Sequence, residues 1–101
     1  MIRHNGQEIL RLIEKNREVI QRRYGARRLG LFGSYARGEA TETSDLDFVV
    51  ELKTKSFDAY MDLKFFLEDL FQCPVDLVLI DTIKPRLRQS ILGEAVYAPG
   101  L

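Results

Sequence analysis

Residues 33–47 read Gly-Ser-Tyr-Ala-Arg-Gly-Glu-Ala-Thr-Glu-Thr-Ser-Asp-Leu-Asp, and this stretch decides the fold of the chain. An apolar run at 29–32 leads into it, and another apolar run at 48–50 follows it. Apolar runs bounded by glycine and polar residues are typical of strands joined by loops. The pattern therefore predicts a strand over 27–32, a tight turn, a short helix, a polar loop and a second strand over 45–52.

The second predicted strand begins with two acidic residues, Asp45 and Asp47. Successive side chains of a strand point to opposite faces, so these two carboxylates share one face and Leu46 lies on the other. Mg²⁺ takes oxygen ligands and is usually held by one or two carboxylates together with substrate phosphates. Asp45 and Asp47 are therefore candidate metal ligands, the alternative being an exposed start of a strand.

The turn before the short helix predicts an anion site. Gly33 ends the first strand, and Ser34 opens the helix, where free backbone N–H groups and the positive end of the dipole favour negative charge. The Ser34 hydroxyl can cap those amides or donate to a phosphate. Arg37 follows one turn later on the same side. Gly33, Ser34 and Arg37 are candidate phosphate-binding residues, although Gly-Ser by itself is an ordinary turn.

A third strand is predicted over 74–80, where Asp76 interrupts an otherwise apolar run. A carboxylate in such a run is costly to bury unless a cation or a hydrogen-bond donor neutralises it. The alternative is an acid at the end of a strand that meets solvent. Asp76 is the third candidate carboxylate of the site.

Helices are predicted around these strands. Apolar residues recur at three- and four-residue steps over 7–24, and a wide apolar face covers 57–72. The tail predicts a helix over 84–92, with a proline in its first turn, and a short strand over 96–98. The element order is α-β-α-β-α-β-α, in a single domain that spans residues 1–101.

Composition and charge exclude several classes of protein. The 15 basic and 15 acidic residues give a net charge of zero, which argues against a sequence-independent grip on long nucleic acid. No apolar run approaches the ~20 residues of a membrane span, and no signal segment opens the chain, so we expect a cytoplasmic protein. One cysteine and one histidine are too few for a zinc site. The histidine, His4, lies at an N-terminus that we expect to be frayed, which argues against a Ser-His-Asp triad. One basic cluster fits either helix-end electrostatics or a surface for an acidic partner or phosphate: Arg22, Arg23, Arg27 and Arg28.

The pattern Gly-Ser, ten residues, Asp-x-Asp resembles the signature of the nucleotidyltransferase superfamily that includes polymerase beta. In so short a chain it is most similar to the minimal nucleotidyltransferases, the MNT family. The resemblance implies an α+β (α/β) fold, a small mixed sheet flanked by helices. It also implies two Mg²⁺ ions about 4 Å apart and ATP or another nucleoside triphosphate as substrate.

The resemblance assigns a role to each candidate residue. Asp45 and Asp47 would bind both ions, and Asp76 would hold the catalytic ion and accept the proton of an attacking hydroxyl. Gly33 and Ser34 would hold the β- and γ-phosphates. Arg37 is a candidate for an additional hydrogen-bond donor to a phosphate.

Minimal members of this family often occur beside a small helical HEPN protein, as toxin–antitoxin pairs. The resemblance implies an antitoxin that transfers AMP from ATP to a tyrosine of its HEPN toxin. Two alternatives stay open: a non-catalytic antitoxin that neutralises its partner by binding, and a transferase acting on a small molecule such as an aminoglycoside. The sequence also leaves open whether the chain forms a homo- or hetero-oligomer.

Overall fold

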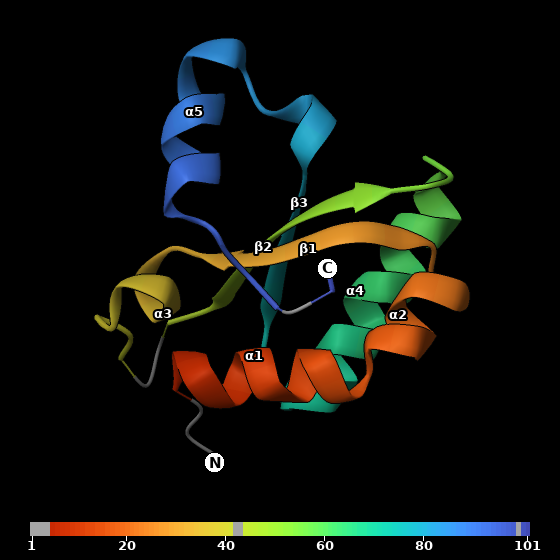
Figure 1. The fold of residues 1–101 in the computed structure, drawn as a ribbon, viewed down its shortest axis with the longest axis horizontal. Coiled ribbons are helices and arrows are strands. Elements are labelled where there is room, and N and C mark those ends of the chain that lie inside the picture. The colour runs from red at the N-terminus through yellow and green to blue at the C-terminus, as the bar shows by residue number, and fades with distance from the viewer. Residues whose placement is uncertain (1–4, 42–43, 99) are drawn as a thin grey trace.

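The computed structural model describes residues 5–41, 44–98 and 100–101. Helices and short strands alternate along the chain, as the sequence predicts for an α+β fold (Figure 1). The elements are α1 (Gly6–Lys15), α2 (Arg17–Arg22), β1 (Ala26–Phe32), α3 (Ser34–Arg37), β2 (Leu46–Leu52), α4 (Phe57–Phe71), β3 (Val75–Leu79), the 3-10 turn η1 (Ile80–Thr82), α5 (Pro85–Glu94) and β4 (Val96–Tyr97).

The four strands form one mixed sheet in the order β3-β2-β1-β4, which confirms the expected sheet type. β1 runs antiparallel to β2 and β4, whereas β2 and β3 are parallel. Phe32 at the end of β1 is opposite Asp47 on β2, and Asp47 is level with Asp76 on β3. The register therefore brings the end of β1 and the acidic positions of β2 and β3 to one end of the sheet.

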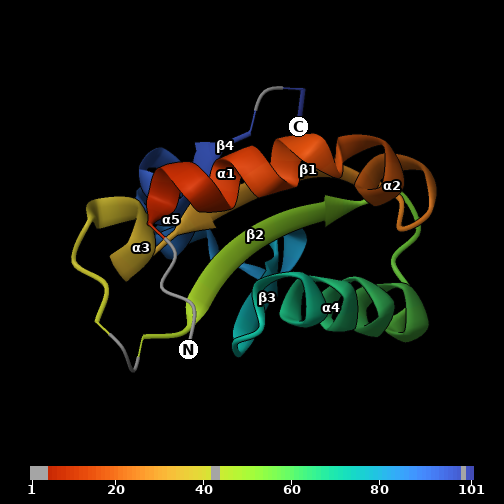
Figure 2. The same cartoon turned by 90° about the horizontal axis from the view of Figure 1, so that it is seen from below.

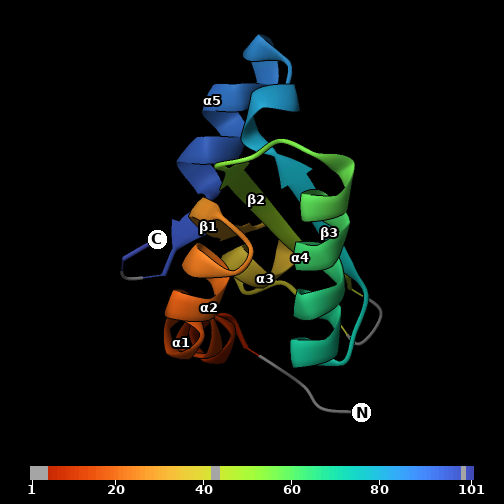
Figure 3. The ribbon, with the colours of Figure 1, turned by 90° about the vertical axis from the view of Figure 1, so that its right-hand side faces the viewer.

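The two faces of the sheet are covered unequally. α1, α2 and α4 lie on one face, and α5 lies on the other (Figures 2 and 3). The helix-rich face holds the main core, in which the following side chains are almost fully buried: Ile9, Ile13, Ile20, Leu29, Leu31, Phe48, Val50, Leu63, Leu67 and Phe71. The α5 face has a smaller cluster, centred on Val49, Ile80 and Ile83.

Strand alternation decides which face carries the acidic residues. Phe48 and Val50 belong to the main core, so Asp47 and Val49 point to the α5 face. On β3, Leu77 belongs to the main core, so Asp76 and Val78 also point to the α5 face. The carboxylates therefore lie on the face with fewer buried side chains.

Local capping explains where two of the helices begin and end. The Asn5 side chain accepts a hydrogen bond of 2.8 Å from the Glu8 amide at the start of α1. Ser56 does the same for the Ala59 amide of α4, at 3.0 Å. α4 ends at Gln72, which adopts the left-handed conformation with φ of 55°.

Two predicted helix boundaries are wrong. The single helix over 7–24 is divided at Asn16, whose φ of −102° and ψ of 14° leave the helical region. The Asn16 side chain donates to the Leu12 carbonyl at 2.8 Å, a local bond that competes with the helical ladder. The tail helix was expected to stop at residue 92, but α5 continues through Gly93 to Glu94.

The short final strand is confirmed as β4 (Val96–Tyr97). The Tyr97 ring lies against Gly30 of β1, where a Cβ atom would come within 2.7 Å of the ring. Among the described residues, no helix combines the length and the apolar character that a membrane crossing needs.

Candidate active site

The turn after β1 requires a glycine. Gly33 has φ of 76° and ψ of −154°, a conformation that residues with a Cβ rarely adopt. A Cβ at this position would also collide with the Asp47 carboxylate and lie 3.1 Å from its Cγ. Gly33, and not Ser34, is the N-cap of α3, and Gly38 ends α3 in the left-handed conformation. The chain therefore turns directly over the first acidic position of β2.

The three candidate carboxylates come from two neighbouring strands. Asp47 is half-buried and level with Asp76 across the parallel pair β2–β3. Asp45 lies immediately before β2 and is exposed. Adjacent strands are about 4.8 Å apart, so Asp47 and Asp76 start from neighbouring backbone positions on one face.

Electrostatics link these groups into one site. Burial raises the pKa of Asp47, and the negative charges of Asp76 and then Asp45 raise it further. Arg37 acts in the opposite direction and lowers the pKa of Asp47. Like charges held together in this way favour either a proton or a bound cation.

Asp76 is exposed, so the expectation of a carboxylate buried in an apolar run, which would need a cation or a donor to neutralise it, is wrong. β3 is an edge strand, and its neighbours Val75 and Leu77, which point to the other face of the sheet, are buried. The register with Asp47, and not desolvation, is what connects Asp76 to the site.

The donor set suits a hard divalent cation. Carboxylate oxygens are the ligands that Mg²⁺ prefers, and mutual repulsion between Asp47, Asp76 and Asp45 is relieved by a positive ion. Within the described part of the chain, no group of three acidic, cysteine or histidine side chains converges closely enough to hold an ion as it stands. Ion binding at this site therefore requires the side chains to rotate toward one another.

The structure adds a residue that the sequence analysis missed. Glu94, the last residue of α5, accepts a hydrogen bond from the Gly33 amide at 3.0 Å. The same oxygen, Oε1, accepts from Arg37 Nη1 at 2.6 Å. Arg37 Nε donates to Glu39 at 2.7 Å, and both acids raise the pKa of Arg37, Glu39 most strongly. Glu94 is 61 positions from Gly33 in sequence, and no local pattern indicates the contact.

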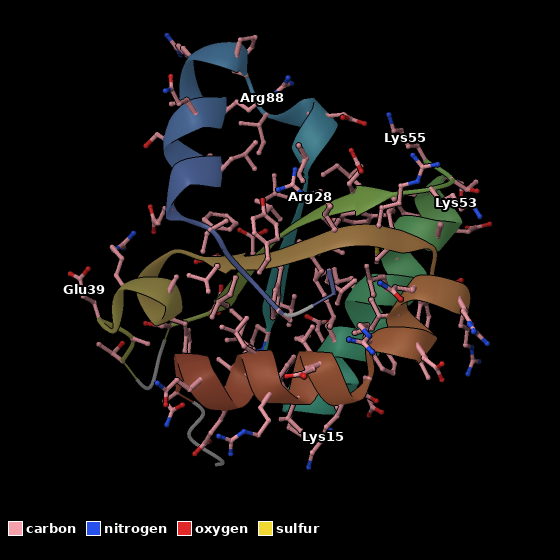
Figure 4. The ribbon with its side chains drawn as sticks, viewed as in Figure 1. Lys15, Arg28, Glu39, Lys53, Lys55 and Arg88 are labelled. Carbon is pink, nitrogen blue, oxygen red and sulfur yellow. The ribbon has the colours of Figure 1, made fainter. Side chains whose placement is uncertain are left out.

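The basic cluster does not form one surface at the site. Arg28 projects on the α5 side of the sheet, with its guanidinium 4.6 Å from the centre of the Tyr97 ring (Figure 4). Arg22 is 3.8 Å from Glu18 on the same helix, and Arg23 lies over the ring of Tyr24. These contacts favour the interpretation as helix-end electrostatics and solvation. Arg37 is the basic residue that acts on Asp47.

A family model described as a nucleotidyltransferase domain matches residues 13–98. The chain belongs to the nucleotidyltransferase family. This nucleotidyltransferase is 36% identical over 92 residues to the protein adenylyltransferase MntA of Thermococcus cleftensis, and the match covers 90% of this chain and 93% of the relative.

Solved structures place the nucleotidyltransferase among the minimal members. A structure of a minimal nucleotidyltransferase superposes with a TM-score of 0.80 at 36% identity, covering 95% of this chain and 98% of that one. A crystal structure of a toxin–antitoxin with AMP-PNP gives a TM-score of 0.69 at 26% identity over 97% of this chain and 75% of that one. A tri-AMPylated Shewanella oneidensis HEPN toxin in complex with its MNT antitoxin matches in fold, with a TM-score of 0.63 at 23% identity, covering 91% of this chain and 73% of that one. The resemblance to the minimal nucleotidyltransferases is confirmed.

Proposed function

We propose that the chain is a protein adenylyltransferase that moves AMP from ATP to a tyrosine hydroxyl of a HEPN-type toxin and thereby acts as its antitoxin. The observation that carries this proposal is the close approach of Gly33 to the Asp47 carboxylate, together with the register that pairs Asp47 on β2 with Asp76 on β3. The match to an adenylyltransferase relative over nine-tenths of the chain supports the reaction. The toxin–antitoxin structure with AMP-PNP supports the nucleotide and the kind of partner.

Asp45, Asp47 and Asp76 would hold two Mg²⁺ ions. When bound, Mg²⁺ supplies positive charge that stabilises the phosphoryl oxygens as the bond to the leaving pyrophosphate breaks. Asp76 is exposed on its edge strand, so it is accessible to an incoming hydroxyl. We assign to Asp76 the acceptance of the proton from that hydroxyl.

The phosphate end of the nucleotide would bind at the turn. Gly33 lets the backbone pass close to Asp47 because it has no Cβ. A phosphate bound to the Gly33 amide would therefore lie close to the Asp47 carboxylate. The Ser34 hydroxyl and the Arg37 guanidinium would add donors, and Arg37 is half-exposed, so it is within reach of a ligand from solvent. Catalysis at such a site consists mainly of positioning and charge stabilisation.

The test is intact mass spectrometry of the HEPN-type partner after incubation with this protein, Mg²⁺ and each nucleoside triphosphate in turn. We expect a gain of one or more AMP units, with ATP as the donor. Asp45→Asn should reduce the rate about a hundredfold or more. Asp62→Asn is the matched control, because Asp62 is also an exposed acid but belongs to α4, on the opposite face of the sheet, and should leave the rate unchanged.

Two other outcomes would replace the proposal. A stable complex and a silenced partner without any gain of mass would identify an antitoxin that works by binding alone. Transfer to a small hydroxylated molecule such as an aminoglycoside, in the absence of the protein partner, would identify a small-molecule transferase.

A further inference from the structure

Glu94 accepts hydrogen bonds from the donors that the proposed function assigns to nucleotide phosphates. Its Oε1 atom accepts from the Gly33 amide at 3.0 Å and from Arg37 Nη1 at 2.6 Å. Figure 1 shows how this arises, since the C-terminal end of α5 descends toward the sheet beside α3. In this conformation a phosphate oxygen and Glu94 would need the same two donors.

A carboxylate oxygen with these partners resembles a phosphate oxygen chemically. Both are anionic, and both accept charge-assisted hydrogen bonds from a backbone amide and a guanidinium. The negative charge of Glu94 also acts on Asp47, whose pKa it helps to raise. The hydrogen bonds from Gly33 and Arg37 hold the Glu94 carboxylate in place, whereas the negative charge of Asp47 repels it.

We propose that Glu94 is an internal competitor for the nucleotide triphosphate, which must displace this carboxylate from Gly33 and Arg37 in order to bind. The inference rests on the proposed function, since it takes the turn to be the phosphate site. Glu94 thereby sets the affinity for nucleotide, and its release couples nucleotide binding to a movement of the last turn of α5.

The surroundings of Glu94 allow this release. It is the last residue of α5, and no residue of α5 is fully buried. Arg37 would also keep an anionic partner, because its Nε is bonded to Glu39 at 2.7 Å independently of Glu94. Displacement therefore breaks two hydrogen bonds without exposing a fully buried residue of α5, and it leaves the guanidinium oriented.

The experiment compares Glu94→Gln with Glu39→Gln in the full chain, by calorimetric titration with ATP and Mg²⁺. Both substitutions remove one negative charge next to Arg37, but only Glu94 contacts the Gly33 amide. We expect Glu94→Gln to lower the Kd for ATP about two- to tenfold, because the neutral amide oxygen of Gln accepts weaker hydrogen bonds from Gly33 and Arg37 than a carboxylate does. Glu39→Gln should not lower it.

An equal gain of affinity in both variants would overturn the inference, because charge alone would then account for it. Unchanged or weaker binding by Glu94→Gln would overturn it as well, and so would an absence of ATP binding by both wild type and Glu94→Gln. If Glu94→Gln does not fold, the wild-type protein still decides the question by NMR. Inorganic tripolyphosphate with Mg²⁺ should move both the Gly33 amide and the Glu94 side-chain carboxyl resonances, and binding that leaves the Glu94 resonance in place contradicts the inference.

Failure of the proposed function gives a different pattern. If Glu94→Gln binds ATP more tightly than wild type but neither protein adds mass to the partner, the competitor is established and the transfer reaction is not. If transfer occurs and the two proteins bind ATP equally, the reverse holds.

Discussion

Two aspartates at opposite ends of the sheet have opposite electrostatic surroundings. Asp81, in η1, is ion-paired with Lys55 at the end of the sheet where β2 finishes, and hydrogen bonding to Lys55 lowers the pKa of Asp81. Asp47, near the start of β2, is surrounded by acids, and burial together with Asp76 and Asp45 raises its pKa. Figure 4 shows how far apart the two ends are, with Lys53 and Lys55 at one end and Glu39 at the other.

The difference in charge surroundings distinguishes an acid in a surface ion pair from an acid in a candidate ligand site. The pair at Asp81 is an ordinary surface ion pair, which needs no ligand. The group around Asp47 gathers like charges, which costs stability unless something positive binds, and such perturbed groups mark functional sites. Substitutions in the two regions should therefore have different effects.

The largest expected effect is on transfer. Asp47→Asn removes the central carboxylate and should lower the rate of AMP transfer about a hundredfold or more, because cation binding and transition-state stabilisation depend on it. Asp81→Asn should change the rate by less than about threefold, since surface ion pairs have little influence at a distance. Single-turnover rates measured by intact mass provide the comparison, and similar losses in both variants would show that the two regions are not functionally distinct.

The next effect is on folding. Gly33→Ala should destabilise the protein by about 1–3 kcal/mol, because alanine is strained at φ of 76° and its Cβ meets the Asp47 carboxylate. Gly93→Ala is the matched control, because Gly93 is helical and a Cβ added there would have nothing within 4 Å. It should stabilise α5 by about 0.5–1 kcal/mol. Urea unfolding measures both values, and a neutral Gly33→Ala would refute the tight turn over Asp47.

Addition of Mg²⁺ should stabilise the folded protein through the carboxylates around Asp47 and not through Asp81. At a Mg²⁺ concentration ten times the Kd, binding to the folded state adds about 1.4 kcal/mol and raises Tm by several degrees. Asp81→Asn should show the same shift as wild type, whereas Asp47→Asn and Asp76→Asn should lose most of it. A full shift in Asp47→Asn would place the cation elsewhere.

The smallest effect is on the pH dependence of stability, and its sign differs between the two aspartates. The raised pKa of Asp47 means that its charge destabilises the fold near neutral pH, and this cost disappears as pH falls through the folded-state pKa. The lowered pKa of Asp81 gives stability above the unfolded pKa of about 3.9, which is lost as pH falls through the folded-state value. In metal-free buffer, Asp47→Asn should therefore be more stable than wild type at pH 7, with a gap that closes toward pH 4.

Asp81→Asn should behave in the opposite way and be less stable than wild type at pH 7, with a gap that closes only at lower pH. Urea titrations at several pH values distinguish the two cases. A gap of the same sign in both variants would contradict the assigned surroundings.

The sequence was sufficient where local patterns decide structure. Strand alternation correctly predicted that Asp47 and Leu46 separate to opposite faces, and the Gly33 turn followed from its place between apolar runs. The helical break at Asn16 was missed because the apolar stripe continues across it, whereas the break is local to Asn16, whose side chain donates to the Leu12 carbonyl.

The rest depends on contacts between distant segments. Asp76 could be placed in a strand, but its exposure depends on which parts of each face of the sheet are covered, which a single sequence does not specify. Glu94 was missed because its role arises only when α5 folds back to bring it to Gly33 and Arg37. Long-range pairing of this kind leaves no periodic signal in the chain.

The most direct test of the central claim is a crystal structure with Mn²⁺ and a nonreactive ATP analogue. The anomalous signal of Mn²⁺, which prefers the same oxygen ligands as Mg²⁺, locates the ion without ambiguity. We predict a peak between the carboxylates of Asp45, Asp47 and Asp76, with the triphosphate beside Gly33. Metal and nucleotide bound together at any other place on the molecule would contradict the account.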